Sequence, residues 1–365
     1  MALWKDTFRG GGFMRYGHLE RYEIHLHTLA PVFIGSGESL SKKEYIFDQR
    51  NGKVHMPDLA RLTGFLAKHS LLPEFEHFMF QSENNNLHAF LSDIGIKPSD
   101  YPAFVTYTID AGEVADSEHF RGVLTFMKNA DGKPYIPGSS LKGAIRTAIA
   151  AKLMKKGNWD RIVQEIERAA DDFRGPRYYV SKEARNLENR VFNKLDLKDP
   201  RNPEKIKWYD IVNDFMRGIR ISDSEPINFD NLTLCGKYDR KPDGEIIILP
   251  IYRECLVPNT TTKLLLTIDK PVLEKFGIDI LFIEDALRDF SNAYQANYEQ
   301  YFAGSKADAK VKTNNGAGII LGGGAGYAAK TLVYPLIPDQ NRALRLVSKM
   351  MTKQFPKHRH EKDTG

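Results

Sequence analysis

The sequence predicts an α+β fold with antiparallel sheets, and three observations lead to this class. Segments with strand-like alternation occur in both halves of the 365-residue chain. Successive strands come as hairpins, whereas a doubly wound parallel sheet would alternate single strands with single helices. The composition, with 42% hydrophobic and 27% charged residues, is that of a globular protein with a sizeable core. The length favours two domains or one large domain.

The elements of the N-terminal half follow from hydrophobic periodicity and from turn residues. Alternating strand formers predict strands, and apolar residues three and four positions apart predict helices. The most clearly patterned helix follows the sequence Ile136-Pro137-Gly138. In chain order we expect a strand at 22–33, a hairpin from 44–47 and 54–56, helices within 57–80 and 87–91, a strand at 104–109 and a helix from Ser139 to about Lys156.

The C-terminal half repeats this mixture of strands and helices. Turns are expected at Pro242-Asp243-Gly244 and at Pro258-Asn259, because these residues favour tight turns. In chain order we expect strands at 231–238, 245–256 and 261–269, helical structure at 271–302, a glycine-rich segment at 316–326 and a last helix at 344–351.

Composition also suggests how the chain is divided. The polar, glycine-rich residues 1–21 are expected to form a leader, and the charged segment 176–218, which has few apolar residues, is expected to be a linker or an excursion. The two expected domains are 22–175, with a helical insertion near 57–95, and 219–356, and residues 357–365 are expected to form a tail.

The charge of the chain is concentrated at one end. Lys and Arg number 52 against 47 Asp and Glu, a net charge of +5, and the stretch from Gln340 to Gly365 carries +5 by itself. A polyanion would therefore be held by local clusters rather than by a global positive field. Four cations of this stretch share one helix face, which is either solvated or faces phosphates: Arg342, Arg345, Lys349 and Lys353.

Several classes of protein and site are excluded. Cys235 and Cys255 are the only cysteines, so a disulfide framework or a cysteine-rich zinc site is not available. No apolar run has the roughly 18 residues that a membrane span needs, and the N-terminus lacks the apolar region of a secretory signal. We therefore expect a cytoplasmic protein without a metal ion or another cofactor.

Two glycine segments could hold an anion through backbone N–H groups. The first is Gly35-Ser36-Gly37, although a plain strand-ending turn has the same pattern. The second contains Gly322, Gly323, Gly324 and Gly326, with Lys330 after it. It resembles a dinucleotide fingerprint, but only 36 residues follow Ala329, too few for the rest of a Rossmann half. It also lacks the glycine that a P-loop has before its lysine.

A third anion-binding candidate is the start of the helix that begins near Ser139. Ser139 or Ser140 would cap this helix, whose free N–H groups, that of Gly138 among them, and dipole favour a phosphate. Lys142 and Arg146 are four residues apart and share a face. Gly143 costs about 1 kcal/mol relative to alanine, which a close backbone or ligand approach would explain. A capped amphipathic helix with two surface cations accounts for the same pattern.

Catalytic motifs are scarce. His25 and His27 share one strand face, but no third residue follows at a recognisable metal-ligand spacing. The chain has neither a G-x-S-x-G nor an H-E-x-x-H motif. No catalytic and no metal-binding residue is predicted.

The string IPGSSLKGAIRTAI at 136–149 resembles the signature of RAMP proteins, the RNA-binding subunits of CRISPR effector complexes. One branch of that family is especially similar, the fifth subunits of type III-A (Csm) complexes. The segments that carry this similarity are LHTLAPVFIGSGE at 26–38, KEYIFD at 43–48, IRISDSEPI at 219–227, LPIYRE at 249–254 and LGGGAGYAAKT at 321–331.

The resemblance implies two RRM-like (ferredoxin-like) RAMP domains whose glycine loops line an RNA path. It implies a subunit that caps the backbone at the 3′ part of the CRISPR RNA and supports its maturation. The implied partners are the CRISPR RNA, the neighbouring backbone RAMP subunit, the small helical subunit and host trimming nucleases. The implied RNA-binding residues are Gly35, Ser36, Gly37, Gly138, Ser139, Ser140, Lys142, Arg146, Arg253, Gly322, Gly323, Gly324, Gly326 and Lys330.

The resemblance also bears on catalysis. The related backbone subunit that cleaves target RNA uses an aspartate in the loop after its first glycine turn. The corresponding segment here, 38–44, has no aspartate, although Glu38 and Glu44 are acids. We therefore expect a non-catalytic RNA-binding subunit. The alternatives are an endoribonuclease that trims the CRISPR RNA 3′ end itself and a scaffold that touches only protein neighbours.

Overall fold

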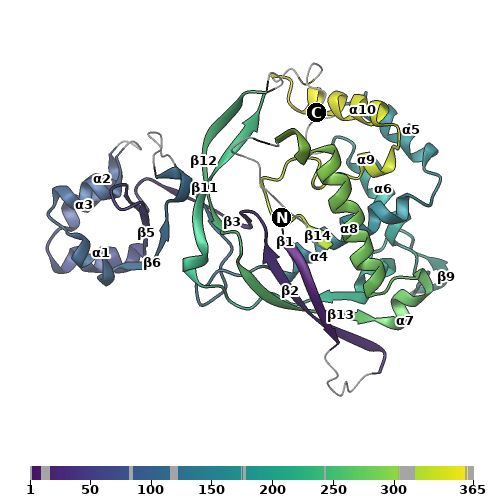
Figure 1. Ribbon diagram of the computed structural model, residues 1–365, viewed down its shortest axis with the longest axis horizontal. Coiled ribbons are helices and arrows are strands. Elements are labelled where there is room, and N and C mark those ends of the chain that lie inside the picture. The colour runs from purple at the N-terminus through teal and green to yellow at the C-terminus, as the bar shows by residue number, and fades with distance from the viewer. Residues whose placement is uncertain are drawn as a thin grey trace.

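The structure is a computed structural model that describes residues 2–9, 17–81, 85–115, 122–173, 175, 178–241, 244–302, 304, 317–357 and 360. Two large sheets and a layer of helices form the body of the molecule (Figure 1). The main apolar core runs from Tyr22 to Met350 and takes residues from both halves of the chain. The mixed α+β class predicted from the sequence is therefore confirmed.

The five-stranded sheet is antiparallel throughout its described pairs. Its central strand alternates as predicted, with Ile24 and Leu26 fully buried while Glu23 and His25 lie on the other face. In spatial order its strands are β10 (Ile219–Ile221), β13 (Thr261–Asp269), β2 (Leu19–Thr28), β1 (Ala2–Arg9) and β14 (Ala317–Ile319).

The expected leader is part of this sheet. Strand β1 pairs with β2 on one side and with β14 on the other. The residues 2–9 include the strand formers Trp4 and Phe8; Trp4 pairs on both sides, and Phe8 pairs with Glu23 of β2. The separation of a leader at 1–21 from the first domain is therefore wrong for its described residues.

The seven-stranded sheet also combines both halves. The hairpin of β11 and β12 inserts between β7 and β6, so that two contacts are parallel, β6 with β11 and β7 with β12. The expectation of antiparallel sheets is corrected for these two contacts, because strands from the two halves fill each other's open edges. In spatial order the strands are β3 (Gly35–Ser41), β7 (Gly122–Phe126), β12 (Ile246–Leu256), β11 (Leu232–Arg240), β6 (Val105–Asp110), β5 (Lys53–Pro57) and β4 (Ile46–Asp48).

The predicted helical insertion forms a lobe at one end of the molecule, at the left of Figure 1. It consists of α1 (Leu59–Lys68), α2 (Leu72–Phe80) and α3 (Leu87–Asp93). The lobe has a small apolar core of its own, which includes Leu62, Phe78 and Leu91. Lys43 joins it to the sheet, because its Nζ donates to the carbonyls of Met79 and Gln81, each at 2.8 Å.

The remaining helices lie together on the right of Figure 1. Helices α4 and α8 pack against each other, and α8 also packs on β14. No helix in the described ranges has the length and apolar content needed to cross a bilayer. The helices are α4 (Gly138–Met154), α5 (Asp160–Ala169), α6 (Ser181–Phe192), α7 (Lys270–Leu273), α8 (Ile280–Asn297), α9 (Val333–Leu336) and α10 (Gln340–Gln354).

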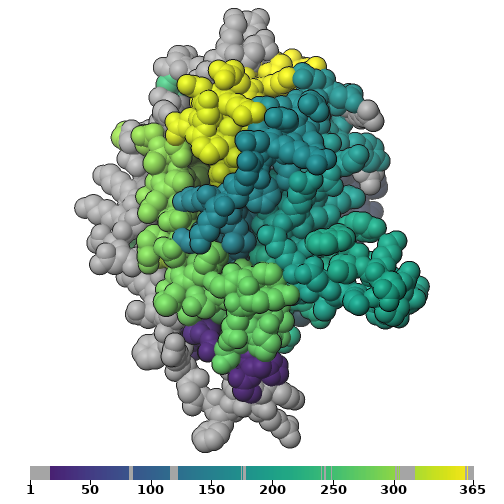
Figure 2. All heavy atoms as spheres, turned by 90° about the vertical axis from the view of Figure 1, so that its right-hand side faces the viewer, coloured from purple at the N-terminus to yellow at the C-terminus, as the bar shows by residue number. Residues whose placement is uncertain are grey.

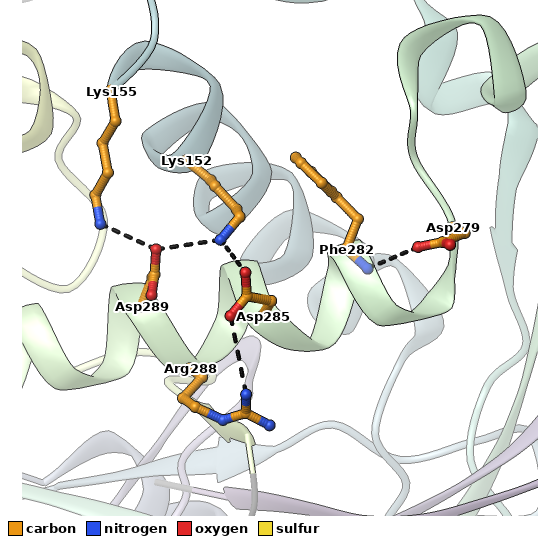
Figure 3. A network of polar contacts seen from close by, with 7 residues as sticks. All are labelled: Lys152, Lys155, Asp279, Phe282, Asp285, Arg288 and Asp289. Carbon is orange, nitrogen blue, oxygen red and sulfur yellow. Dashed lines mark hydrogen bonds and ion pairs between the residues drawn. The ribbon is translucent and has the colours of Figure 1, made fainter.

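A charged network joins α4 of the N-terminal half to α8 of the C-terminal half (Figure 3). Lys152 Nζ donates to Asp285 and, at 3.2 Å, to Asp289, which also accepts from Lys155 Nζ at 3.0 Å. The hydrogen bond to Asp285 raises the pKa of Lys152. Because the two halves share both large sheets, the main core and this network, they do not pack as two independent units.

The segment 176–218 is more than a linker. It contains α6, and its residues Val191, Phe192 and Phe215 are almost completely buried in the main core. Charged residues separate these apolar ones along the segment. Its few apolar residues are still enough to form one buried helix face. It also contains the short antiparallel ribbon of β8 (Lys198–Asp199) and β9 (Asn202–Ile206). Most of the expected tail, 357–365, lies outside the described residues.

Candidate nucleic-acid interface

Two of the three glycine segments meet at the side chain and carbonyl of Phe33. Gly323 N donates to Phe33 O at 2.8 Å. A Cβ at Gly322, where φ is +75°, would lie 1.8 Å from the same carbonyl oxygen, and a Cβ at Gly35 would lie 2.9 Å from the Phe33 ring. Glycine is therefore required for the close approach of the two segments.

The first glycine segment is a bulge within a strand, and not the turn that the sequence predicts. Gly35 pairs with Phe126 of β7, but the next pair joins Ser39 to Leu124, so the residues between them bulge out of the ladder. Gly37 has φ +95° and is exposed. The bulge is fixed from within, since the Ser36 hydroxyl oxygen lies 2.6 Å from Thr125 Oγ1 and accepts from Glu38 N at 3.0 Å. Bulges commonly re-aim backbone groups at functional sites.

Arg253 on β12 lies between these two glycine segments. Its guanidinium carbon is 5.2 Å from the centroid of the Phe33 ring, and a Cβ at Gly324 would lie 2.4 Å from its Nη1. Its buried Nε has no hydrogen-bond partner in the part of the chain that the structure describes. A bound anion would provide the acceptors that this cation lacks.

The pocket in front of Arg253 measures about 220 Å³. Glu299 also lines it, so the pocket is not uniformly cationic. The hydrogen bond with Cys235 and burial both raise the pKa of Cys255 well above its usual value, which keeps this thiol neutral and unreactive. The pocket is lined by Ala30, Pro31, Phe33, Cys235, Gly236, Arg253, Cys255, Tyr294, Glu299, Ile320, Leu321, Gly323, Gly324 and Ala325.

The glycine loop continues past the pocket to Lys330. Tyr294 of α8 holds the loop, because its hydroxyl donates to Ala325 O at 3.0 Å. A Cβ at Gly326, where φ is +77°, would lie 2.5 Å from the Tyr298 hydroxyl oxygen. Gly326 and Lys330 are exposed, as is Tyr327. An extended ligand could therefore pass from the pocket over exposed backbone to a cation.

The helix tip at Gly138 is occupied by the protein itself. Gly138 N donates to Asp223 Oδ1 at 2.8 Å, and a Cβ there would lie 2.4 Å from the carbonyl oxygens of Ile221 and Ser222. The carboxylate of Asp223 thus takes the place that a phosphate would have. Ser139 and Ser140 lie inside the first turn, so the expectation that one of them caps the helix is wrong.

Arg146 has partners within the chain, and its role as an RNA-facing cation stays a prediction. Its guanidinium bonds to Asp214 at 2.6 Å, lies 3.6 Å from Glu188 and stacks over the ring of Phe192 at 3.6 Å. These contacts join α4 to the segment 176–218. The sequence could not reveal them, because the partners are more than 40 positions away.

Lys142 and Gly143 give a different result. Lys142 forms no ion pair with the described residues, and desolvation lowers its pKa. Gly143 is exposed, and a Cβ there would meet nothing within 4 Å. The close backbone approach considered for Gly143 is therefore absent among the described residues. Lys142 stays a predicted RNA contact. It lies near the helix start, where the Gly138 amide already donates to Asp223.

The predicted set omits Phe33 and Glu254. The signal for Phe33 was an aromatic residue two positions before a glycine segment, while nothing local marks Glu254. The carboxylate of Glu254 is fully buried and accepts from Tyr107 Oη, Phe126 N and Lys128 Nζ, each at 2.7 Å. It therefore fixes β12 against β7 directly beside Arg253.

The cationic face of α10 packs toward α5, as the adjacent yellow and teal surfaces near the top of Figure 2 show. Arg342 makes a two-pronged contact with Glu167 at 2.6 and 2.8 Å, and Lys349 bonds to Asp171. Two of the four cations are thus neutralised by acids of their own chain, which favours an internal role for this face over a phosphate-facing stripe.

The described ranges hold no group of three or more histidine, cysteine, aspartate or glutamate residues that could bind a metal ion. Of the two acids in the loop 38–44, Glu44 accepts from Ser41 N at 2.7 Å, and Glu38 is exposed.

Sequence comparison relates the chain to known proteins. A sequence model of the RAMP superfamily matches residues 25–315. The "CRISPR system Cms protein Csm5" of Streptococcus thermophilus is 32% identical over 345 residues, which covers 91% of this chain and 86% of that protein. A protein of the same description from Mycobacterium tuberculosis (strain ATCC 25618 / H37Rv) is 28% identical over 342 residues and covers 87% and 84%.

Solved structures share the fold. A chain of the Csm–crRNA–target RNA ternary complex of a type III-A CRISPR-Cas system aligns with a TM-score of 0.64 at 21% identity, covering 89% of this chain and 91% of the other. The crystal structure of T. onnurineus Csm5 aligns with a TM-score of 0.61 at 19% identity, covering 93% and 95%.

Proposed function

The chain belongs to the RAMP superfamily, in the branch that the Csm5 proteins form, and from this premise we propose that it is an RNA-binding subunit of a type III-A antiviral ribonucleoprotein. Its ligand is the CRISPR RNA. Its protein neighbours are the adjacent backbone RAMP subunit and, in addition, the small helical subunit. The two Csm5 relatives support this assignment, because each is similar to the chain over most of its length, at 32% and 28% identity.

The observation that carries the proposal is the position of Arg253. A guanidinium whose buried Nε has no partner among the described residues faces a pocket between exposed backbone of two glycine segments. Such an arrangement suits a phosphodiester, which offers charged acceptors to the cation and to nearby N–H groups. Contacts of this kind position a nucleic acid without reading its bases, so recognition is expected to be largely independent of sequence.

We assign to this subunit the 3′ part of the CRISPR RNA, at the end of the backbone complex. By covering that part it sets how far trimming nucleases reach, and in this way it supports maturation. We assign it no cleavage of its own. The absence of an aspartate from the loop 38–44 supports a binding role.

The test is an RNA titration of the purified full chain at two or more salt concentrations. Arg253→Gln is expected to weaken binding of a fluorescently labelled CRISPR RNA about tenfold and to reduce the slope of log K against log salt by about 1. Arg161→Gln, at an 82% exposed position of α5, is the matched control and should leave both unchanged. Unchanged affinity of folded Arg253→Gln would refute the assignment.

The nuclease alternative needs a separate measurement. The full chain is incubated with a precursor RNA, with and without divalent metal ions. We expect the RNA to keep its length in both conditions. Clean 3′ shortening by the pure protein would show that it trims the RNA itself.

A further inference from the structure

An exposed apolar patch lies on the segment around β8 and β9, which projects from the body of the molecule as a blue-green lobe at the lower right of Figure 2. Large apolar side chains are normally scattered singly over a surface. Here they gather on one short segment: Leu197 is 43% exposed, Trp208 57%, Tyr209 70%, Ile211 81% and Val212 44%. We call these five residues the lobe patch.

Two buried asparagines fix the backbone that carries the lobe patch. Asn213 is 1% exposed; its Oδ1 accepts from Leu197 N at 2.6 Å and its Nδ2 donates to Lys207 O at 2.9 Å. Asn193 Nδ2 donates to Trp208 O at 2.8 Å. The patch is therefore presented on a held backbone rather than on a frayed loop. Binding through a pre-ordered surface avoids part of the entropy cost of association.

The charge around the lobe patch argues against a nucleic-acid ligand. Residues 194–212 contain five basic and four acidic side chains, a net charge of only +1. Lys207 is already paired with Asp199 at 2.9 Å. A single-stranded nucleic acid would need a clear excess of positive charge beside the stacking rings. Three of the five side chains are aliphatic and offer no stacking face. A near-neutral apolar surface matches a protein.

We propose that the lobe patch is a docking surface for a near-neutral apolar surface on a neighbouring protein subunit of the ribonucleoprotein. The existence of that assembly rests on the proposed function. Trp208 and Tyr209 are of the residue types that carry most binding energy in protein interfaces. The charged side chains around them form the polar rim that such interfaces have.

Crosslinking identifies what covers the patch. The photoreactive residue p-benzoylphenylalanine replaces Tyr209 in the full chain, and the ribonucleoprotein is reconstituted from its protein subunits and CRISPR RNA. We expect a light-dependent crosslink to one other protein subunit. A crosslink to RNA or to a second copy of this chain, or no crosslink in the assembled complex, would overturn the proposal.

A variant measures how much the patch contributes. Trp208→Ala combined with Ile211→Ser should lower incorporation into the complex at least tenfold while RNA affinity stays within twofold. Phe80→Ser is the matched control, since Phe80 is 91% exposed at the end of α2 in the opposite lobe (Figure 1). Normal incorporation of the folded double variant would refute the docking surface. If the proposed function itself were wrong, the unmodified chain would not bind RNA.

Discussion

The guanidinium of Arg253 lies over the ring of Phe33, 5.2 Å from its centroid, and this ring also packs against Gly35 and Gly323. One aromatic side chain thus joins the strand bulge, the glycine loop and the cation into a single unit. Because the N–H groups of a guanidinium lie in its plane, the stacked ring leaves this edge available to an anion. The relationship makes the geometry of Arg253 dependent on both glycine segments.

Gly324→Ala should weaken RNA binding by moving Arg253. The new Cβ would lie 2.4 Å from Arg253 Nη1, at a φ of +90° that disfavours a side chain. We expect a loss of about 1 kcal/mol in stability together with a severalfold loss of RNA affinity in the same titration. Gly323→Ala is the control, because its Cβ would make only ordinary contact with Phe33, at 3.4 Å. Equal RNA affinities of the two variants would contradict the prediction.

Arg146→Ala should lower stability, with little direct effect on RNA contacts. It removes the guanidinium from Asp214, whose side chain is only 12% exposed, and from the ring of Phe192. We expect a fall of about 1.5–3 kcal/mol in the free energy of unfolding, measured by urea denaturation. Lys142→Ala, without an ion pair among the described residues, should cost less. An Arg146→Ala variant with unchanged stability and weaker RNA binding would support the role predicted from the sequence.

Glu254→Gln should destabilise the sheet beside the candidate site. The carboxylate is fully buried and bonds to Lys128, Tyr107 and the Phe126 amide. Removal of its charge leaves the Lys128 ammonium, 18% exposed, without its counter-ion, and we expect a loss of about 2–4 kcal/mol in unfolding free energy.

A double-mutant cycle isolates this pair. Glu254→Gln combined with Lys128→Met should cost clearly less than the sum of the two single changes, since neither partner then stays buried and charged alone. Additive costs would show that the two side chains are not coupled.

The contact between Glu167 and Arg342 should make stability depend on pH in the acid range. The hydrogen bond from Arg342 lowers the pKa of Glu167 below its ordinary value of 4.5. A carboxyl whose folded pKa is depressed contributes above its unfolded pKa and loses this contribution as the pH falls through the folded value. Because both side chains are about one third exposed, the contribution should stay below about 1 kcal/mol.

The measurement compares unmodified chain with Glu167→Gln by urea denaturation between pH 7 and pH 3. The difference in unfolding free energy should be largest at neutral pH and should shrink as the pH falls below 4.5. Glu183→Gln on α6 controls for the loss of one negative charge, since Glu183 forms no ion pair with the described residues. A difference that does not change with pH would contradict the assignment.

Most elements could be predicted because their signals are local. The alternation of β2, the hairpins β4–β5 and β11–β12 and the helix α4 each follow from spacing within about 20 residues. The helical insertion was predicted for the same reason, and its small core is made mainly from its own helices. The strands β1, β3, β7 and β14 and the helix α5 were not predicted, and of these β1 and β14 are defined by pairing with distant partners.

The candidate site, like the fold, could be predicted where its signals are local and could not where they depend on distant residues. The glycine segments and Arg253 were predicted from residue type and resemblance, and they meet at Phe33. The helix tip at Gly138 has the same local pattern as an anion site, but Asp223, 85 positions away, already accepts its amide. The pattern shows only that a helix start favours a negative charge. It does not show whether that charge comes from a ligand or from the protein.

The amino-acid sequence alone determined the α+β class, the position of most helices and strands, and the glycine-rich segments, because periodicity and backbone freedom are properties of neighbouring residues. Tertiary structure decided that both halves share two sheets, that Arg146 bonds to Asp214 and that Arg253 Nε has no partner in the part of the chain that the structure describes. These outcomes depend on which strand edges and which charges are brought together by burying one common core, and such long-range pairing leaves no mark on local spacing.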